Sequence, residues 1–374
     1  MTRSFTRRDI LRSGLVLAGA LGTAGLAGCS SKPSQGEAIT IGFVPIACAA
    51  PLVLAHANGL FEKHGVKVQL KKFAGWADLW TAYATGDLTV AHMLSPMPIA
   101  VDAALTNASR PTEIAFTQNT NGQALTLGAQ HHPHVQSVQD LRGMVLGIPF
   151  EYSVHALLLR DYLASHGVDP VRDVELRLLR PPDMVAQLEV GTIDGFIGPE
   201  PFLQRTLTTG AGRIFELTKN MWAGHPCCSV AMAKDFRTEH PQQARGLTAA
   251  LTEAAAVLND PAHASESAAQ LGKEKYLNQK PKLIEPALTG KYVNWADEPV
   301  VDPDYLRFGD PTSATAITWM AAQLHRFELD GGQLNSDHAI GAAARSVLPA
   351  DADTSLSPAT INGQVFDPAR YLAS

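Results

Sequence analysis

The sequence lacks an excess of positive charge. Its 374 residues hold 30 lysines and arginines against 36 aspartates and glutamates, which gives a formal net charge of -6 and a pI near 6.1. Nucleic acids are held by clustered basic side chains, so we do not expect a nucleic acid partner. Cysteine is also scarce, and four cysteines in so long a chain are too few for a disulfide scaffold.

Charged residues make up only 18% of the chain, whereas hydrophobic residues make up 45%. A mostly disordered chain has the opposite balance, so this composition excludes one and is typical of globular proteins. The length is sufficient for two domains of ordinary size with short additional segments.

The apolar run near the N-terminus is too short for a comfortable membrane span. It extends from Leu15 to Ala27, whereas a spanning helix needs about 20 apolar residues. No charged residue occurs between Ser13 and Ser31. Four arginines precede this uncharged stretch: Arg3, Arg7, Arg8 and Arg12. This order of basic and apolar segments predicts a secretory signal peptide over residues 1–28.

Two short motifs refine the predicted signal peptide. Residues 6–12, with Arg7 and Arg8, are similar to a twin-arginine export signal. Residues 26–29 are similar to a lipobox, in which Cys29 would be acylated and become the mature N-terminus, and residues 29–38 would form a lipidated tether. The alternative is an ordinary signal peptide with a chance cysteine. We expect an extracytoplasmic protein that is lipid-anchored to the cell membrane.

The remaining sequence contains two stretches in which strands and helices alternate. The first has strands at 39–46, 66–73 and 88–93, with helices at 49–58 and 78–85 between them; the second has strands at 144–148, 174–179 and 193–197, with helices at 154–166 and 182–190. This order predicts an α/β fold in which each half is a mainly parallel sheet with flanking helices. After residue 241 the pattern becomes mostly helical, over 244–258, 263–271 and 310–326, and the tail from residue 350 is expected to pack loosely.

Several motifs along the chain together point to one family. Residues 41–45 (IGFVP), 59–65 (GLFEKHG), 83–92 (YATGDLTVAH) and 188–195 (LEVGTIDG) resemble periplasmic solute-binding proteins of ABC importers. Closer similarity to the nitrate- and bicarbonate-binding lipoproteins, which are related to the sulfonate/taurine-binding and thiamine-pyrimidine-binding proteins, is carried by five segments in order: Gly75-Trp76, residues 95–98 (SPMP), 121–125 (NGQAL), 198–201 (GPEP) and 222–226 (WAGHP). The resemblance extends over residues 39 to 330.

The resemblance implies a two-lobed fold of the periplasmic-binding-protein type II. We expect lobe I at 39–120 and about 235–374, and lobe II at about 121–234. A small solute would be captured between the lobes and delivered to a membrane permease driven by a cytoplasmic ATPase. The chain itself has no phosphate-binding GxxxxGK[ST] loop. We therefore expect a monomeric binding protein without enzymatic activity, cofactor or metal; the alternatives are an exported enzyme or a ligand-sensing lipoprotein on the same fold.

Candidate ligand-binding residues follow from the rule that open α/β sheets bind ligands beyond the carboxyl ends of their strands. The residues at these ends and at the crossing segments are Cys48, Ala49, Trp76, His92, Gln123, Pro149, Glu200, His225 and Cys228. In the resembled family, residues matching Trp76 and Gln123 contact the small oxyanion, and both are neutral donors. The alternatives are core packing for Trp76, a structural amide for Gln123, a buried structural imidazole for His92 and a helix-capping or surface carboxylate for Glu200. Trp80, one turn after Trp76, is expected in the core.

The segment Pro226-Cys227-Cys228 departs from the resembled pattern, because we expect charged residues just after the His-Pro pair in nitrate or bicarbonate binders. Without a fixed positive charge, the site favours a neutral organic solute or an anion held only by backbone and neutral donors. Three interpretations of the thiols remain open: a disulfide between Cys48 and one of the pair, a soft-metal site with His92 or His225, or buried packing, which the sequence favours. The histidines of residues 131–134 (HHPH) are expected in an exposed loop without metal.

Overall fold

The computed structural model describes residues 38–106 and 108–372, which belong to one compact unit. The predicted signal peptide, the lipidation site at Cys29 and nearly all of the predicted tether lie outside the described residues. Among the described helices, none combines the length and the apolar character needed to cross a membrane.

A six-stranded sheet collects strands from three distant parts of the chain. Its spatial order is β13 (Leu306–Phe308), β4 (Thr112–Asn121), β10 (Pro226–Ala233), β3 (Val90–Leu94), β1 (Ile39–Phe43) and β2 (Val68–Lys72). Strand β1 is parallel to both of its neighbours, β2 and β3. Strands β10, β4 and β13 extend the sheet with antiparallel pairs.

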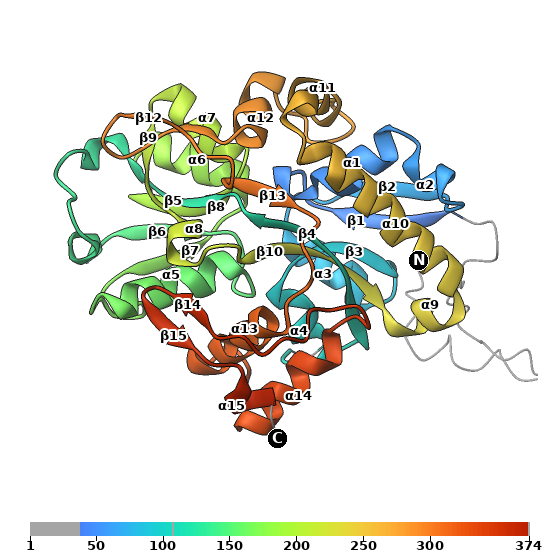
Figure 1. The fold of residues 1–374 in the computed structure, drawn as a ribbon. Coiled ribbons are helices and arrows are strands. Elements are labelled where there is room, and N and C mark those ends of the chain that lie inside the picture. Colours follow the sequence, from blue (N-terminus) through green and yellow to red (C-terminus); the bar gives the residue numbers. More distant parts are fainter. Residues whose placement is uncertain (1–37, 107, 373–374) are drawn as a thin grey trace, which may run out of the picture. The chain divides into compact units, whose positions relative to one another are not determined.

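The other large sheet has five strands and repeats this plan. Its spatial order is β7 (Glu175–Leu178), β6 (Val145–Ile148), β8 (Gly195–Pro199), β5 (Gln123–Gly128) and β9 (Gly212–Leu217). Strand β6 is parallel to β7 and β8, and β5 is antiparallel to β8 and β9. Figure 1 shows β6 and β7 in this sheet and β1 to β3 in the other.

The predicted α/β class with two sheets is confirmed, but the expectation of mainly parallel sheets is wrong. Only the strands joined by helical crossovers are parallel. The chain passes from one sheet to the other at two connections, from β4 to β5 and from β9 to β10. The strands at these connections form antiparallel pairs because no helical crossover joins them to the strands beside them. Each sheet is therefore mixed.

The turn between β4 and β5 requires an unusual backbone. Asn121 and Gly122 have φ values of +55° and +84°. At Gly122 an added Cβ would lie 2.4 Å from Leu306 Cδ1, so glycine is needed there for two independent reasons. This turn passes the chain directly from the six-stranded to the five-stranded sheet.

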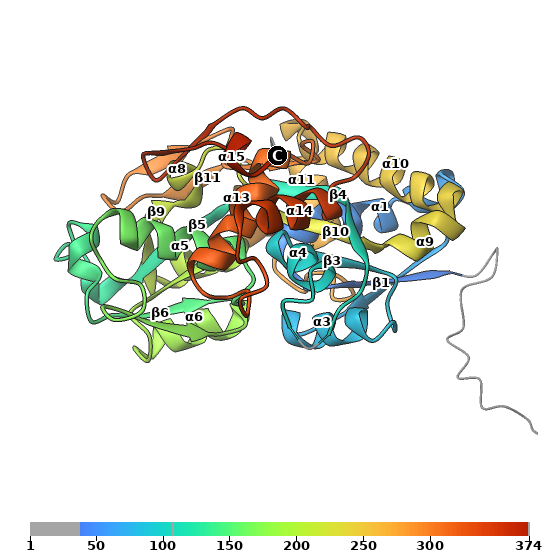
Figure 2. The same cartoon turned by 90° about the horizontal axis from the view of Figure 1, so that it is seen from below.

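Helices connect the parallel strands, as expected. Those of the first part are α1 (Ala50–Ala57), α2 (Leu60–Lys63), α3 (Trp76–Ala84) and α4 (Pro96–Asp102), and those of the second part are α5 (Val154–Ser165), α6 (Pro181–Glu189), α7 (Phe202–Thr209) and α8 (Thr218–Met221). In Figure 2, α3 and α4 lie beside β1 and β3, whereas α5 and α6 lie beside β5 and β6.

The last third of the chain is mostly helical and returns to the first part. It contains α9 (Lys234–Glu239), α10 (Pro241–Leu258), α11 (Ala264–Leu271), α12 (Pro281–Leu288), α13 (Ala314–Arg326), α14 (Asp337–Val347) and α15 (Ala369–Leu372). Two small hairpins accompany them, β11 (Lys291–Val293) with β12 (Pro299–Val301), and β14 (Ala359–Ile361) with β15 (Gln364–Phe366). Helix α10 packs along α1 (Figure 1). The tail is mostly exposed over 351–358, although Ile361 is buried.

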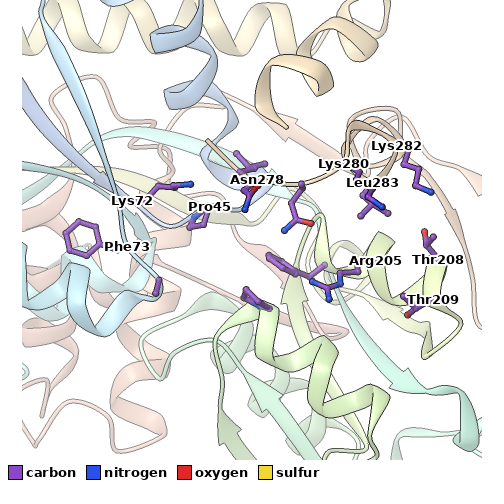
Figure 3. A pocket seen from close by; sticks show the side chains of 15 residues that line it. Pro45, Lys72, Phe73, Arg205, Thr208, Thr209, Asn278, Lys280, Lys282 and Leu283 are labelled. Atoms are coloured by element: carbon purple, nitrogen blue, oxygen red, sulfur yellow. The ribbon is translucent and has the colours of Figure 1, made fainter. Parts of the chain in front are cut away.

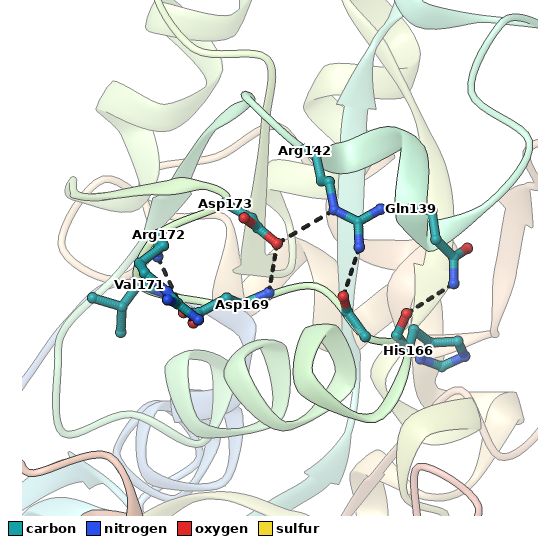
Figure 4. A network of polar contacts seen from close by, with 8 residues as sticks. Gln139, Arg142, His166, Asp169, Val171, Arg172 and Asp173 are labelled. Carbon is teal, nitrogen blue, oxygen red and sulfur yellow. Dashed lines mark hydrogen bonds and ion pairs between the residues drawn. The ribbon is translucent and has the colours of Figure 1, made fainter.

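Helix α5 is fixed at both ends. At its start, the Ser153 side chain accepts a hydrogen bond of 3.0 Å from Ala156 N. Just beyond its end, Arg142 Nη2 donates to Gly167 O at 2.6 Å and Gln139 Nε2 donates to His166 O at 2.8 Å (Figure 4). These donors satisfy carbonyl groups that a helix end leaves free, so the orientation of α5 is well determined.

Candidate functional site

Three cysteine side chains gather in the interior. Cys48 lies in a 3₁₀ turn at Ala47–Ala49, directly before α1, and Cys227 and Cys228 are near the start of β10. Cys227 Sγ is 3.9 Å from Cys48 Sγ and 3.7 Å from Cys228 Sγ, and the three sulfur atoms lie within 4.8 Å of one another. All three side chains are buried and free of disulfides. We name these residues the thiol cluster.

Two neighbouring cysteines can share one cluster because β10 is irregular there. Successive side chains of a regular strand point to opposite faces. The pairing of β10 with β4 shifts register on both sides of Cys228, which is the mark of a β-bulge. The bulge accounts for both thiols being near Cys48. Because β10 belongs to the six-stranded sheet, Cys48 and Cys227 both come from elements of that sheet.

Gln123 and His155 reach the thiol cluster from elements of the five-stranded sheet. Gln123, the first residue of β5, places Nε2 3.8 Å from Cys48 Sγ and also donates to Asn121 O. His155, in the first turn of α5, places Nε2 4.0 Å from Cys227 Sγ. Both side chains are buried. The site therefore joins side chains of both sheets.

His155 was missed in the sequence analysis. Its Nδ1 atom has no hydrogen-bond partner among the described residues. Burial, followed by the charge of His225, lowers the pKa of His155 to about 3, so the ring is neutral at physiological pH. One feature of the sequence could have identified it. Ser153, in the loop after strand β6, is a residue type that starts helices, and it places the histidine two positions later in the first turn of a helix that begins at a strand end.

The thiols differ in how readily they ionise. Burial opposes ionisation of Cys48, but hydrogen bonds from Cys227, Cys228 and Gln123 outweigh it and hold its pKa below the ordinary cysteine value. Burial raises the pKa of Cys227 and of Cys228. Cys48 is thus the thiol of the cluster that ionises first.

Glu200 is buried beside the cluster, but its carboxylate is fully engaged. Oε1 accepts hydrogen bonds from Tyr305 Oη at 2.6 Å and Gln204 Nε2 at 3.3 Å, and Oε2 accepts one from Gln204 N at 3.1 Å. Burial raises its pKa to about 7 despite these donors. Its backbone oxygen accepts a bond of 2.8 Å from Ala47 N, which links the ends of β8 and β1. The structure thus favours the helix-capping alternative for Glu200.

His225 has a structural partner as well. Its Nε2 lies 2.9 Å from Thr218 Oγ1, and Thr218 in turn donates to Gln123 O at 3.0 Å. Burial lowers the pKa of His225 to about 4. His225 is therefore linked to Gln123 through Thr218. Ala49 and Pro149 are also buried. Ala49 follows Cys48 in the sequence, and Pro149 follows the last residue of β6.

Trp76 and His92 are buried, and within the described part of the chain no hydrogen bond joins either of them to the thiol cluster. Trp76 begins α3, and its Nε1 has no hydrogen-bond partner among the described residues. Both ring nitrogens of His92, in β3, lack partners within the same part of the chain, and burial lowers its pKa to about 3. A buried donor without a partner is costly, so these groups are available to a ligand.

Trp80 is buried in the core, as expected, and its ring also makes contacts with the loop before α5. It is 9% exposed, and its ring stacks on Tyr152 at 5.5 Å between centroids and lies 6.1 Å from Phe150. Tyr152 and Phe150 are in the loop between β6 and α5, whereas Trp80 is in α3. The ring is therefore a core residue that also joins elements of the two sheets.

The candidate site offers neutral donors only. No lysine or arginine of the described residues forms a hydrogen bond or ion pair with the side chains of the thiol cluster, Gln123, His155 or Glu200. An anion in this place would be held by N–H groups alone.

A basic groove of about 760 Å³ lies near the ends of β1 and β2. Figure 3 shows Lys72, Arg205, Lys280 and Lys282 around it, and the lining contains no aspartate or glutamate. Pro45 and Phe73 come from one sheet and Arg205 from α7 beside the other, so the groove lies between elements of both. None of the residues predicted to bind the ligand lines it. Clustered cations of this kind raise the local concentration of anions.

A family model described as the NMT1-like family matches residues 32–272. Among curated proteins, the chain is 33% identical over 304 residues to the bicarbonate transport ATP-binding protein CmpC of Synechocystis sp. PCC 6803, covering 77% of this chain and 46% of CmpC. It is 30% identical over 275 residues to the nitrate/nitrite binding protein NrtA of Synechococcus elongatus, covering 68% of this chain and 62% of NrtA. The chain spans about half the length of the first of these relatives.

Solved structures share the fold. The periplasmic nitrate-binding protein NrtA from Synechocystis PCC 6803 superposes with a TM-score of 0.81 at 23% identity, covering 90% of this chain and 98% of that one. The alkanesulfonate-binding protein SsuA from Xanthomonas axonopodis pv. citri, bound to MOPS, superposes with a TM-score of 0.62 at 18% identity, covering 80% and 94%. At these identities the likeness shows a common fold.

Proposed function

Since the chain belongs to the NMT1-like family, we propose that it is the extracytoplasmic solute-binding component of an ABC importer. The relatives named for nitrate, bicarbonate and sulfonate binding or transport support this role. The solute is a small oxyanion or a small organic compound such as a sulfonate. The chain binds it without chemical turnover and hands it to a membrane permease with a cytoplasmic ATPase.

The observation that carries the proposal is a buried polar site built from both sheets. Cys48 and Cys227 belong to elements of the six-stranded sheet, and Gln123 and His155 belong to elements of the five-stranded one. A ligand that contacts both groups favours the closed arrangement by its difference in affinity for the two states. The basic groove supports capture of an anion, since it places cations near the same strand ends.

Two lobes follow from this proposal. We assign residues 39–120 to lobe I together with the C-terminal part, and residues from about 121 to lobe II, as the sequence suggests. Strand β10 pairs within the six-stranded sheet, so we place the second boundary between β9 and β10 and not near residue 234. Export by the twin-arginine route, acylation of Cys29 and a monomeric state complete the proposal.

A thermal-shift screen of the purified full chain tests this function. The panel contains nitrate, bicarbonate, aliphatic sulfonates and small neutral organic compounds, each at several concentrations. A ligand at 100 times its dissociation constant should add about 2.7 kcal/mol to the free energy of unfolding. Hits are then titrated by calorimetry and incubated for product analysis. Turnover of a bound compound, or the absence of any stabilising solute in the panel, would contradict the proposal.

A further inference from the structure

The thiol cluster remains unexplained by the binding of an oxyanion or a sulfonate. Thiols are weak donors, and the site contains three of them within 4.8 Å of one another. Buried cysteines usually pack as small hydrophobic side chains at scattered places in a core. Here a bulge in β10 turns two consecutive cysteines toward a third that is 179 positions distant in sequence.

The sulfur positions fit the ligand sphere of a metal ion. Sulfur atoms that each lie about 2.3 Å from a tetrahedral ion are about 3.8 Å apart. The two measured separations from Cys227 Sγ, to Cys48 Sγ and to Cys228 Sγ, are 3.9 and 3.7 Å. Two of the three sulfur separations therefore nearly match the required spacing before any ion is bound, and the third, between Cys48 and Cys228, is within 4.8 Å.

His155 is the histidine in contact with the cluster, but its ring nitrogens do not lie within 4.8 Å of all three sulfur atoms, so the ring must shift to become the fourth ligand. Its Nε2 lies 4.0 Å from Cys227 Sγ, against about 3.6 Å for a nitrogen and a sulfur on one tetrahedral ion. Its Nδ1 has no partner in the described part of the chain, so the polar needs of this fully buried ring are not met by the protein. His225 is already hydrogen-bonded to Thr218, and no hydrogen bond among the described residues joins His92 to the cluster.

We propose that Cys48, Cys227 and Cys228, with His155 as fourth ligand, bind one thiophilic metal ion of the Zn(II) or Cu(I) class. This inference rests on the proposed function, because it treats the metal ion as a solute that the same site of the importer's binding protein captures. Thiolate sulfur and imidazole nitrogen are the ligands that both ions prefer. The sequence favoured simple packing of the three thiols, since it could not show that they converge.

Binding is an exchange of protons for a metal ion and needs no oxidant. Each thiol that ligates loses its proton to solvent, and the imidazole binds through a nitrogen lone pair. For Zn(II), three thiolates and a neutral imidazole give a complex with a net charge of about -1. Gln123 Nε2, 3.8 Å from Cys48 Sγ, is placed to donate to a sulfur that carries this charge.

The ion would also connect the two sheets. The three sulfur ligands come from the turn before α1 and from β10, whereas the imidazole comes from α5. Coordination of all four groups therefore stabilises the arrangement in which α5 lies against the six-stranded sheet. This coupling is the property that an importer requires of its solute.

The test titrates the reduced full chain with Zn(II), and separately with Cu(I) under anaerobic conditions, each against a competing chromophoric chelator. We expect one ion per chain. Each of Cys48→Ser, Cys227→Ser and Cys228→Ser should weaken binding by about a hundredfold or more, and His155→Asn by about tenfold. Cys29→Ser removes the remaining cysteine of the chain and is the matched control, with unchanged affinity. Circular dichroism verifies that each variant folds.

A second measurement uses the unaltered protein. X-ray absorption of the loaded chain should show three sulfur ligands near 2.3 Å and one nitrogen ligand. Binding of neither ion, a ligand sphere of oxygen and nitrogen only, or equal affinity of the three cluster variants would overturn the proposal. These readouts need no anion and no permease, so a negative solute screen with positive metal binding, or the reverse, separates this inference from the proposed function.

Discussion

Gln123 Nε2 lies 3.8 Å from Cys48 Sγ, and this contact joins the first residue of β5 to the turn ahead of α1. The two residues belong to different sheets and are 75 positions apart in sequence. Gln123 also accepts, through its backbone oxygen, a hydrogen bond of 3.0 Å from Thr218. Its amide is therefore held at the boundary between the two halves, where a solute would meet it.

Loss of a neutral donor should weaken solute binding. We expect Trp76→Ala and Gln123→Ala each to reduce the affinity for the solute found in the screen by about tenfold or more, because each removes an N–H donor from a buried site. Calorimetric titration measures the effect. Trp295→Phe is the control, because Trp295 Nε1 donates to Val135 O elsewhere in the structure. Equal affinities of the wild type and both site variants would remove these residues from the site.

Glu200 should give the protein a pH-dependent stability. Its pKa is raised from 4.5 to about 7 in the folded protein, so the folded state holds a proton that the unfolded chain has released. Stability contributed by this group is therefore complete below pH 4.5 and falls by about 3 kcal/mol as the pH rises to about 7. In Glu200→Gln this slope should vanish.

Urea unfolding between pH 4 and 8 checks this prediction by the difference between wild type and Glu200→Gln. Comparing the two proteins cancels the effect of the buried histidines, whose lowered pKa values make stability fall as the pH drops below 6.5. A difference in unfolding free energy that stays constant across the range would show that Glu200 is ionised in the folded state.

The stacking of Trp80 on Tyr152 should help to hold the two halves together. We expect Trp80→Ala to lower the unfolding free energy by about 3 kcal/mol and to increase the radius of gyration, because the ring contacts the loop before α5. Denaturant unfolding and small-angle X-ray scattering measure the two effects. Trp80→Phe should retain most of the contact. An unchanged radius of gyration in Trp80→Ala would show that the stack does not restrain the halves.

The turn between β4 and β5 should tolerate no side chain at position 122. Gly122→Ala combines a φ of +84° with a Cβ position 2.4 Å from Leu306 Cδ1. Gly143→Ala is a matched control, since Gly143 has a φ of +82° and no atom within 4 Å of the added Cβ. We expect a loss of about 1 kcal/mol for the control and about 2 to 4 kcal/mol for Gly122→Ala in denaturant unfolding. Equal losses would show that the Leu306 contact relaxes without cost.

The basic groove should accelerate the capture of anions. Arg205→Gln and Lys280→Gln should each lower the association rate for an anionic solute about two- to tenfold at low ionic strength, with little change in the dissociation rate. Stopped-flow measurements at increasing salt check this, because the difference from wild type should shrink as salt screens the charges. An equal slowing by Lys273→Gln, outside the groove, would indicate a general effect of net charge.

Local patterns were sufficient for much of the fold. The alternation from β1 to β3 and from β6 to β8 was predicted because hydrophobic strands separated by glycine-terminated helices have a clear period. The long crossing strands β4 and β10 were missed, because a strand buried on both faces shows no alternation that distinguishes it from a helix. Both are buried along almost their whole length. Their antiparallel pairing depends on contacts between distant residues, which no local pattern contains.

The candidate site was predictable only in part. Cys48, Gln123 and Cys228 were identified because they follow strand ends or crossings, and the structure brings them together. His155 was missed because it lies inside an apolar helical run, in which the pattern predicts a core side chain. The convergence of Cys227 with Cys228 depends on a register shift, which changes the direction of one side chain and leaves no mark in the sequence.

The bulge in β10 makes the chemistry of the interior sensitive to chain length. Deleting a single residue there would shift the pairing with β4 by one position, and the side chains on one side of the deletion would exchange faces. One of the two consecutive sulfurs would then point away from Cys48. Relatives that gain or lose one residue at this place could therefore change what they carry without replacing any amino acid that contacts the cargo.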